Sequence, residues 1–222
     1  MKTDSIAIGT RIGQLVDPAF FVSWTRLLLR GRQAGDVVLM PAVGLPHSGA
    51  CNFLVDGFLQ TECDALLFID DDMVFEPESL DALRKSAGDY DVLSALYTTR
   101  REPVRPIVMH RMPNGYAPRQ ADKCFGMVDC DVVGLGFTLI GRGMIEKAAA
   151  ERGPEGVFTW SNMLGEDGEF CDYTQRNGGR VGCNCDVIVG HRVAYTSRWS
   201  ASENAVEMEL ENFRLNIERK AG

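Results

Sequence analysis

The sequence predicts an α/β fold, a three-layer α/β/α sandwich with a mostly parallel central sheet. In the N-terminal half, short apolar runs alternate with longer segments whose apolar side chains recur at helical spacing. Such alternation is typical of parallel strands joined by helices that cover both faces of a sheet. The 222 residues, 45% of them hydrophobic, suffice for one domain with a sizeable core and are too few for two ordinary domains. We therefore expect a single domain over residues 1–222.

Three strand-helix units account for the N-terminal half. The first helix carries Phe21, Trp24, Leu27 and Leu28 at helical spacing. The third is marked by Pro77, which suits a first turn, and by Gly88, which suits a helix end. The expected strands are residues 5–9, 37–40 and 65–69, and the expected helices are residues 19–30, 47–59 and the stretch between Pro77 and Gly88.

The C-terminal half is richer in strands and loops. A helix that begins in residues 165–169 and runs to Gln175 is ended by Gly178 and Gly179. Residues 201–222 carry an apolar stripe opposite an acidic face, which predicts a C-terminal helix. The other expected elements are strands within residues 90–97, 103–110, 125–140 and 181–189, and a helix over residues 143–151.

Composition narrows the classes of function. The net charge of -8 argues against a broad basic surface for nucleic acid or anionic membrane. No stretch approaches the roughly 20 apolar residues that span a bilayer, and the polar opening Met1–Ser5 lacks the apolar core of a signal peptide. We therefore expect a cytoplasmic protein. Its seven cysteines fall mainly within apolar segments, which favours buried, reduced thiols over disulfides.

The clearest chemical signal is an aspartate triplet that directly follows an apolar strand. Asp70, Asp71 and Asp72 come after four apolar residues, at the end of a predicted parallel strand where ligands bind in open α/β sheets. Clustered carboxylates repel each other unless a cation neutralises them, and hard oxygen ligands select Mg²⁺ or Mn²⁺ together with phosphate oxygens. The triplet thus predicts a metal-diphosphate site. A polar turn in which aspartates act as local caps is the simpler alternative.

Two weaker signals follow later in the chain. Glu166 and Asp167 begin a helix, where acids are also favoured by the helix dipole alone. His191 closes an apolar strand, where a neutral imidazole can complete a metal shell or serve a structural role. Their order after the aspartate triplet strengthens the functional interpretation of both.

Four segments occur in this order: Leu66–Pro77, Val133–Ile140, Gly165–Asp167 and Val187–His191. Together they resemble the family-2-like glycosyltransferases of the GT-A type, including compact phage and bacterial members. The resemblance extends over roughly residues 47–191. It implies a GT-A-like sandwich and a metal-dependent transfer of a sugar from a nucleotide-sugar donor, a UDP- or GDP-sugar, to an acceptor hydroxyl.

The donor side of such an enzyme holds the metal and the nucleotide. The resemblance implies that Asp70 and Asp72 bind Mn²⁺ or Mg²⁺ and that Asp70 and Asp71 contact the donor. It also implies His191 as a metal ligand. Thr10 and Arg11, at the end of the first strand, are our candidates for contacting the nucleotide base. Residues 1–100 would form the nucleotide-sugar-binding half of the domain.

The acceptor side would be formed by residues 101–200. The resemblance implies that Glu166 and Asp167 face the acceptor, and in an inverting reaction one of them removes the proton of the acceptor hydroxyl. Gly134 and Gly136 would let the backbone approach the donor sugar or the acceptor closely. Cys51 stands where the family often has an arginine, which leaves the phosphate contacts of that segment open.

Other interpretations remain at this stage. A basic cluster contains Arg100, Arg101, Arg105 and Arg111. It fits a solvated face, contacts to a phosphate group, or an acceptor that is a modified DNA base, although the overall acidity disfavours DNA. Asp70 and Asp72 also fit the nucleophile motif of a haloacid-dehalogenase-like phosphatase. A third possibility is a non-catalytic module that binds sugar nucleotides.

Overall fold

The structure is a computed structural model, and it describes residues 1–100, 103–161, 164–192, 198–200 and 205–207. Its helices are α1 (Pro18–Arg26), α2 (His47–Leu59), α3 (Glu78–Ser86), α4 (Arg142–Arg152) and α5 (Glu166–Arg176), with short helical turns η1 (Leu27–Gly31), η2 (Ala121–Lys123) and η3 (Pro154–Gly156). The main sheet contains β1 (Ile6–Ile12), β2 (Val37–Val38), β3 (Ala42–Val43), β4 (Ala65–Asp70), β6 (Val92–Leu96), β9 (Met127–Asp129), β11 (Phe137–Gly141) and β12 (Val181–Ile188).

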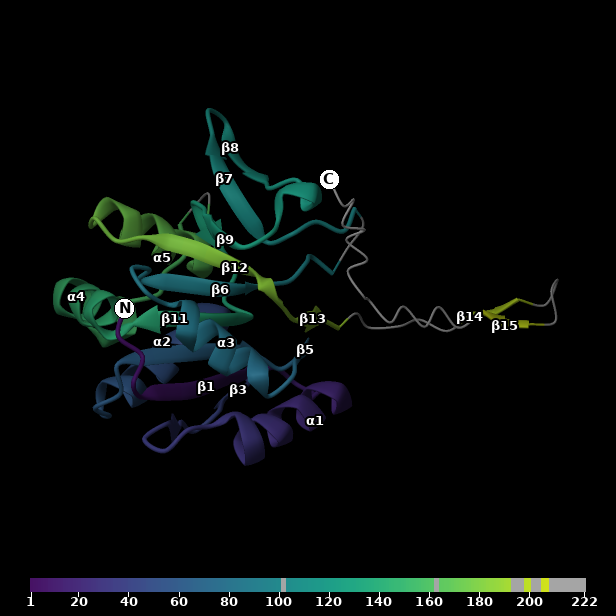
Figure 1. Cartoon of the computed structure of the whole chain (residues 1–222), viewed down its shortest axis with the longest axis horizontal. Helices are drawn as coiled ribbons and strands as arrows, with labels where there is room; N and C mark the ends of the chain where they lie inside the picture. Colours follow the sequence, from purple (N-terminus) through teal and green to yellow (C-terminus); the bar gives the residue numbers. More distant parts are fainter. Residues whose placement is uncertain (101–102, 162–163, 193–197, 201–204, 208–222) are drawn as a thin grey trace.

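The main sheet is mostly parallel, as predicted. Its strand order is β2-β1-β4-β11-β6-β12-β9, with β3 also paired to β1 (Figure 1). Strand β1 runs parallel to β2, β3 and β4, and β12 runs parallel to β6. Strands β11 and β9 run antiparallel to their neighbours. The carboxyl ends of β1, β4, β6 and β12 therefore share one edge of the sheet, where the aspartate triplet lies.

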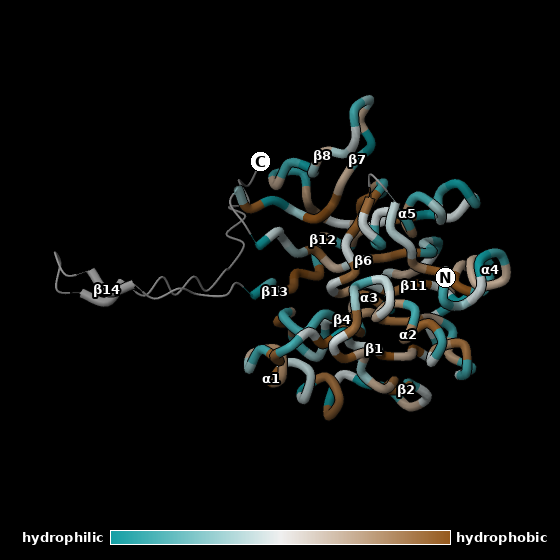
Figure 2. Tube along the Cα trace, turned by 180° about the vertical axis from the view of Figure 1, so that it is seen from behind, coloured by the Kyte–Doolittle hydropathy of each residue, from teal (hydrophilic) through white to brown (hydrophobic). Residues whose placement is uncertain are grey.

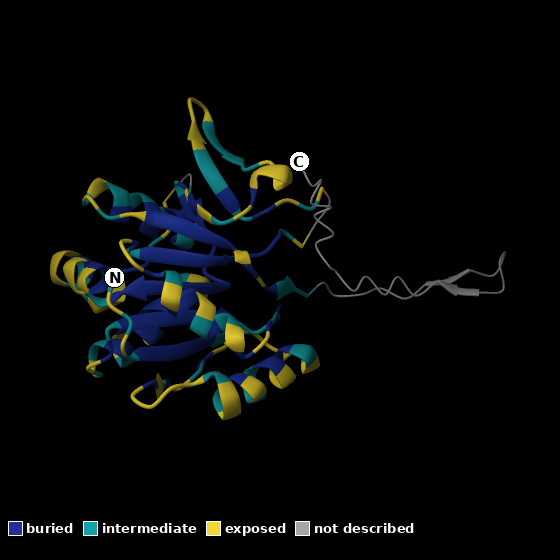
Figure 3. Cartoon of the chain, viewed as in Figure 1, coloured by how far each residue is buried: buried dark blue, intermediate teal, exposed yellow. Residues whose placement is uncertain are grey.

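Helices cover both faces of this sheet, which gives the predicted three layers. Along β4, Leu66 and Phe68 pack in one core with α2, α4 and α5, whereas Leu67 and Ile69 pack in the other with α1 and α3. This alternation follows from the period of two along a strand. Figure 2 shows hydrophobic strands inside more hydrophilic helices, and Figure 3 shows the same strands buried.

Two small ladders extend the architecture. Strand β5 (Met73–Val74) pairs antiparallel with β13 (Gly190–His191), which places His191 opposite Met73. The chain after β12 therefore returns to the end of β4. A second sheet contains β10 (Val132–Val133), β7 (Val108–Met112) and β8 (Gly115–Pro118). Its β7–β8 hairpin rises beyond β9 in Figure 1.

Several element boundaries differ from the sequence predictions. The first helix ends as a π-helical turn at η1, and the strand expected over residues 103–110 begins only at Val108. Most of the predicted C-terminal helix lies outside the described residues, and the part that is described, β15 (Ala205–Glu207), is a strand paired with β14 (Arg198–Ser200).

The cysteines and the helix lengths can be compared directly with the sequence. All seven cysteines are free thiols and buried, as the sequence predicts. None of the helices in the described ranges has the length and apolar content that crossing a membrane requires.

Candidate active site

The three aspartates lie where β4 leaves the sheet, and each has a different partner. Strand register places Arg11 of β1 directly beside Asp70. The Arg11 guanidinium donates from Nε to Asp70 Oδ1 at 2.7 Å, and its Nη2 lies 2.6 Å from the same oxygen. The backbone N–H of Gly13 donates to Asp71 Oδ2 at 2.7 Å. The predicted repulsion within the triplet is thus relieved in part by the protein's own cation and backbone.

Arg11 also joins the triplet to the second acid group. Its Nη1 lies 3.3 Å from Glu166 Oε1 on α5 and donates to Cys51 Sγ on α2 at 3.1 Å. The side chain is only 11% exposed, so these contacts are made in a largely desolvated setting. Burial raises the pKa of the Cys51 thiol to about 12, which keeps it neutral beside the guanidinium. Arg11 therefore contacts both Asp70 and Glu166, although these two acids lie far apart in the sequence.

Asp72 and His191 form the second part of the site. His191 Nδ1 lies 2.7 Å from the carbonyl oxygen of Thr98, which can only accept, so Nδ1 carries the proton of the neutral ring. His191 Nε2 faces Asp72 Oδ2 at 3.4 Å. In the doubly protonated ring Nε2 pairs with the carboxylate, and in the neutral ring it presents a lone pair to a cation. Arg100 donates from Nη1 to the same Oδ2 at 2.7 Å. Burial raises the pKa of Asp72, but His191 and Arg100 outweigh this effect and lower it, so the carboxylate is ionised.

Asp72 and His191 fit a divalent cation. Asp72 Oδ1 is buried without a hydrogen-bond partner among the described residues, which is costly for a carboxylate oxygen unless something binds there. A histidine held through Nδ1 with Nε2 turned toward a carboxylate is a common metal-binding arrangement. The described residues contain no group of three or more His, Cys, Asp and Glu side chains arranged to hold a metal. Mg²⁺-type ions commonly take only one or two carboxylates and complete their shell with phosphate and water.

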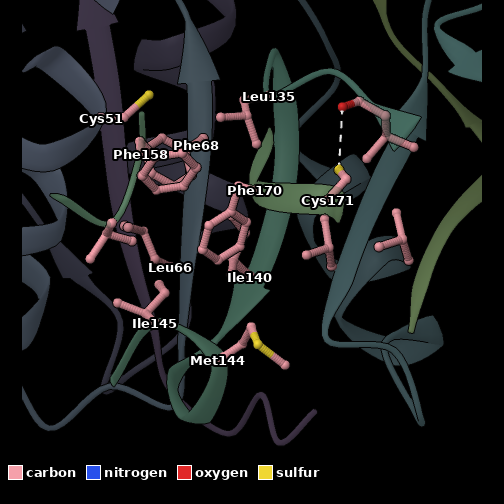
Figure 4. Close-up of a cluster of buried hydrophobic side chains, with 14 of the residues drawn as sticks. Cys51, Leu66, Phe68, Leu135, Ile140, Met144, Ile145, Phe158, Phe170 and Cys171 are labelled. Carbon is pink, nitrogen blue, oxygen red and sulfur yellow. Dashed lines mark hydrogen bonds between the residues drawn. The ribbon is translucent and has the colours of Figure 1, made fainter. Parts of the chain in front are cut away.

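Glu166 and Asp167 begin α5, which packs on an aromatic core. Phe170 lies one turn after Glu166 on the same helix face and stacks on Phe158 with ring centroids 4.5 Å apart (Figure 4). Phe158 also meets Phe68 of β4 edge-on at 5.3 Å. These contacts connect α5 to the strand that carries the aspartate triplet, which explains how the two acid groups come together.

Asp167 carries a carboxyl group whose pKa lies above that of an ordinary aspartate. Burial raises its pKa and the nearby carboxylates of Glu166 and Asp70 raise it further, while the Gly168 N–H, which donates to Oδ1 at 2.7 Å, and Arg11 oppose the shift. A carboxylate with a raised pKa takes up a proton more readily than an ordinary aspartate. Glu166, in contrast, shares its Oε1 with Arg11.

Tyr97 packs against Gly136 and His191, and no sequence pattern predicts this role. Its hydroxyl oxygen accepts from the Gly136 N–H at 2.8 Å, and its ring meets the His191 ring edge-on at 5.5 Å. A Cβ at Gly134 would lie 2.2 Å from this hydroxyl, and one at Gly136 would lie 3.0 Å from it. Both glycines are therefore needed for packing against Tyr97. Their predicted approach to donor or acceptor stays a prediction.

An open cavity of about 550 Å³ adjoins His191. It is lined by Thr99, Arg100, Pro103, Arg105, Ile107 and His191. Two members of the basic cluster, Arg100 and Arg105, thus face the candidate site, whereas Arg111 pairs with Asp172 on α5. Arg101 lies outside the described residues. The cavity is large enough for a small ligand beside Asp72 and His191.

The structure brings most predicted site residues together. Arg11 contacts both Asp70 and Glu166, Asp72 faces His191, and Asp71 follows Asp70 at the same strand end. Thr10 is almost fully buried, and its hydroxyl has no partner among the described residues, so its predicted contact with the nucleotide base has no support in the placement of its side chain. Sequence reasoning also missed the specific role of Arg100, which stood only as one member of a basic cluster.

No family model matches the chain, and no curated protein sequence matches it. Among solved structures, it is similar to one described as the crystal structure of A197 from STIV. The TM-score is 0.52 at 17% sequence identity, and the match covers 90% of this chain and 98% of that chain. At this identity the similarity concerns the fold alone, and it supports the α/β class.

Proposed function

We propose that the protein is a metal-dependent glycosyltransferase that moves a sugar from a nucleotide-sugar donor to an acceptor hydroxyl. One observation carries the proposal: Asp72 is ionised, its Oδ1 is buried without a hydrogen-bond partner among the described residues, and its Oδ2 faces His191 Nε2. The same strand end is joined through Arg11 to Glu166, which precedes Asp167. A metal-diphosphate site and an acceptor base are the two components that such a transfer needs.

On the donor side, Asp72 and His191 would hold Mn²⁺ or Mg²⁺, with Asp70 as a further candidate. When bound, the cation supplies Lewis-acid stabilisation of the negative charge that develops on the departing diphosphate. Asp70 is kept in place by two contacts to Arg11, and Asp71 by the Gly13 N–H. This end of β4 thereby presents carboxylates in fixed positions before any ligand arrives.

On the acceptor side, Asp167 is the proposed base of an inverting reaction. Its carboxylate accepts the proton of the acceptor hydroxyl as the hydroxyl oxygen bonds to the sugar carbon and the bond to the diphosphate breaks. Glu166, held by Arg11 and 3.7 Å from His47 Nδ1, would orient the acceptor. In a retaining reaction, the same two carboxylates would position the acceptor without removing its proton.

The alternatives have less support. A phosphatase of the haloacid-dehalogenase type would use Asp70 as nucleophile, but Oδ1 of this residue is engaged by two nitrogens of Arg11. A module that only binds sugar nucleotides would not require a carboxylate of raised pKa next to the donor acids.

A panel of UDP- and GDP-sugars with Mn²⁺ tests the proposal. A donor at about 100 times its dissociation constant stabilises the fold by about 2.7 kcal/mol, which corresponds to a shift in melting temperature of about 5–10 °C for a chain of this size. Asp72→Asn should abolish the shift, and Asp56→Asn, at an exposed position of α2, should leave it unchanged. Metal-dependent release of nucleoside diphosphate supports transfer. Release of phosphate from a phosphoester would instead support the phosphatase, and binding without turnover would support the binding module.

A further inference from the structure

One carboxylate oxygen of the site has two competing partners. Oδ2 of Asp72 lies 2.7 Å from Arg100 Nη1 and 3.4 Å from His191 Nε2. His191 is fixed by its contact to the Thr98 carbonyl. Arg100 is held differently, because its side chain is 55% exposed and Asp72 is its only ion-pair partner among the described residues. Of the two partners, Arg100 is the one that can leave at low cost.

The loop that carries Arg100 is closed at its base by hydrogen bonds, while the Arg100 side chain is 55% exposed. The Thr99 N–H donates to the Arg105 carbonyl at 2.9 Å, and the Arg105 N–H donates to Thr99 Oγ1 at 3.1 Å, which closes the base of this loop. The Ile107 N–H donates to the Tyr97 carbonyl at 2.9 Å, one step further along. Arg100 and Arg105 therefore emerge from a closed loop base, and both line the cavity beside His191.

Because Oδ2 is the Asp72 oxygen that faces His191 Nε2, a divalent ion held by both residues competes with the Arg100 guanidinium for Oδ2. They carry charge of the same sign, and cations so close together repel strongly where water is partly excluded. A guanidinium displaced from Asp72 stays at the rim of the cavity, since its backbone is fixed. A second arginine, Arg105, lines the same cavity. Two guanidinium groups that converge on one cavity favour a phosphate.

We propose that Arg100 exchanges Asp72 for a phosphate group, so that a divalent ion and a phosphate-bearing substrate enter the site together. The inference rests on the proposed function. Arg100 acts first as an internal cation that competes with the metal and then as a ligand of the phosphate in the cavity. The phosphate belongs either to the donor diphosphate or to a phosphorylated acceptor, and the two sources can be separated by experiment.

The first test measures Mn²⁺ binding in the absence of nucleotide, with the electron paramagnetic resonance signal of free Mn²⁺ as the readout. Arg100→Gln should bind Mn²⁺ about three- to tenfold more tightly than the unmodified protein, because the competing ion pair is gone. Arg105→Gln is the matched control, since it removes the same charge from the same cavity without a contact to Asp72. It should change the affinity by less than about twofold.

The second test is the coupling between metal and phosphate, measured by calorimetry. Mn²⁺ should tighten the binding of UDP or GDP, and Arg100→Gln should reduce this enhancement about fivefold or more, because linkage between two ligands is reciprocal. A loss of coupling with the nucleoside diphosphate assigns the phosphate to the donor. If coupling is lost only in the binding of methyl phosphate, measured on protein that already holds Mn²⁺ and nucleotide, the phosphate is assigned to the acceptor.

Two results would overturn the inference. One is an equal Mn²⁺ affinity of Arg100→Gln and Arg105→Gln, which would mean that Arg100 affects Mn²⁺ binding only through its charge and not through its contact with Asp72. The other is unchanged coupling with both phosphate probes. Failure of the proposed function looks different, because the unmodified protein and both variants would then bind no Mn²⁺, with or without nucleotide.

Discussion

Replacing Arg11 with Met removes the charge that joins the two acid groups while keeping most of the volume of the buried stem. The structure gives Arg11 two contacts to Asp70 and one to Glu166, with its side chain 11% and that of Glu166 9% exposed. Breaking a buried ion pair from one side costs about 3–5 kcal/mol, because the remaining charge stays desolvated. Asp70 is 28% exposed and partly solvated, so we expect a loss of about 2–4 kcal/mol.

The assay is thermal unfolding followed by circular dichroism. For a chain of this size, the expected loss lowers the melting temperature by about 5–15 °C. The triple variant Arg11→Met, Asp70→Asn, Glu166→Gln should recover much of this loss, since no unpaired charge remains. Arg180→Met, which breaks an exposed ion pair with Asp129, serves as a control and should have a much smaller effect. If Arg11→Met unfolds at the normal temperature, or if the triple variant is no more stable than the single one, Arg11 does not compensate these acids.

Two further predictions concern chemistry and packing. Asp167→Asn should lower transfer by about 10²- to 10⁴-fold, the usual contribution of a general base. As the pH is lowered, the unmodified protein should lose activity at a higher pH than it would with an ordinary aspartate as base, because burial raises the pKa of Asp167 and the base is lost once it is protonated. A pH–rate profile without that acid limb would contradict this role. Gly134→Ala should destabilise the fold by about 1–3 kcal/mol, because its Cβ would lie 2.2 Å from the Tyr97 hydroxyl, and Tyr97→Phe should restore part of the loss. Gly143→Ala in α4, where nothing lies within 4 Å of the added Cβ, should be neutral or stabilising.

The regular part of the fold could be predicted because local periodicity determines it. The predicted helix over residues 47–59 coincides with α2, and the strand expected at residues 65–69 agrees with β4 to within one residue. Both have long apolar patterns that fit one secondary structure and not the other. The order of the strands follows less directly, since β11 inserts antiparallel between β4 and β6, a pairing that depends on tertiary packing.

The candidate site was only partly predictable for the same reason. The acids at positions 70–72 and 166–167 stand out in the sequence, but their link through Arg11 depends on the register of β1 against β4. His191 reaches Asp72 through the β5–β13 ladder, which is two residues long and leaves no periodic signal. Gly134 and Gly136 were predicted for approach to a ligand, and the structure adds a packing reason, Tyr97, that cannot be read from sequence spacing.

The most direct test of the account is donor affinity with and without Mn²⁺, measured calorimetrically for Asp72→Asn and Asp167→Asn. Asp72 faces His191 at the proposed metal site, whereas Asp167 begins α5 on the acceptor side. We predict that Asp72→Asn loses metal-dependent donor binding and that Asp167→Asn keeps it while transfer is lost. Loss of donor binding in Asp167→Asn as complete as in Asp72→Asn would show that the acids form one metal cluster. Normal donor binding in both variants would place the active site elsewhere and contradict the proposed glycosyltransferase.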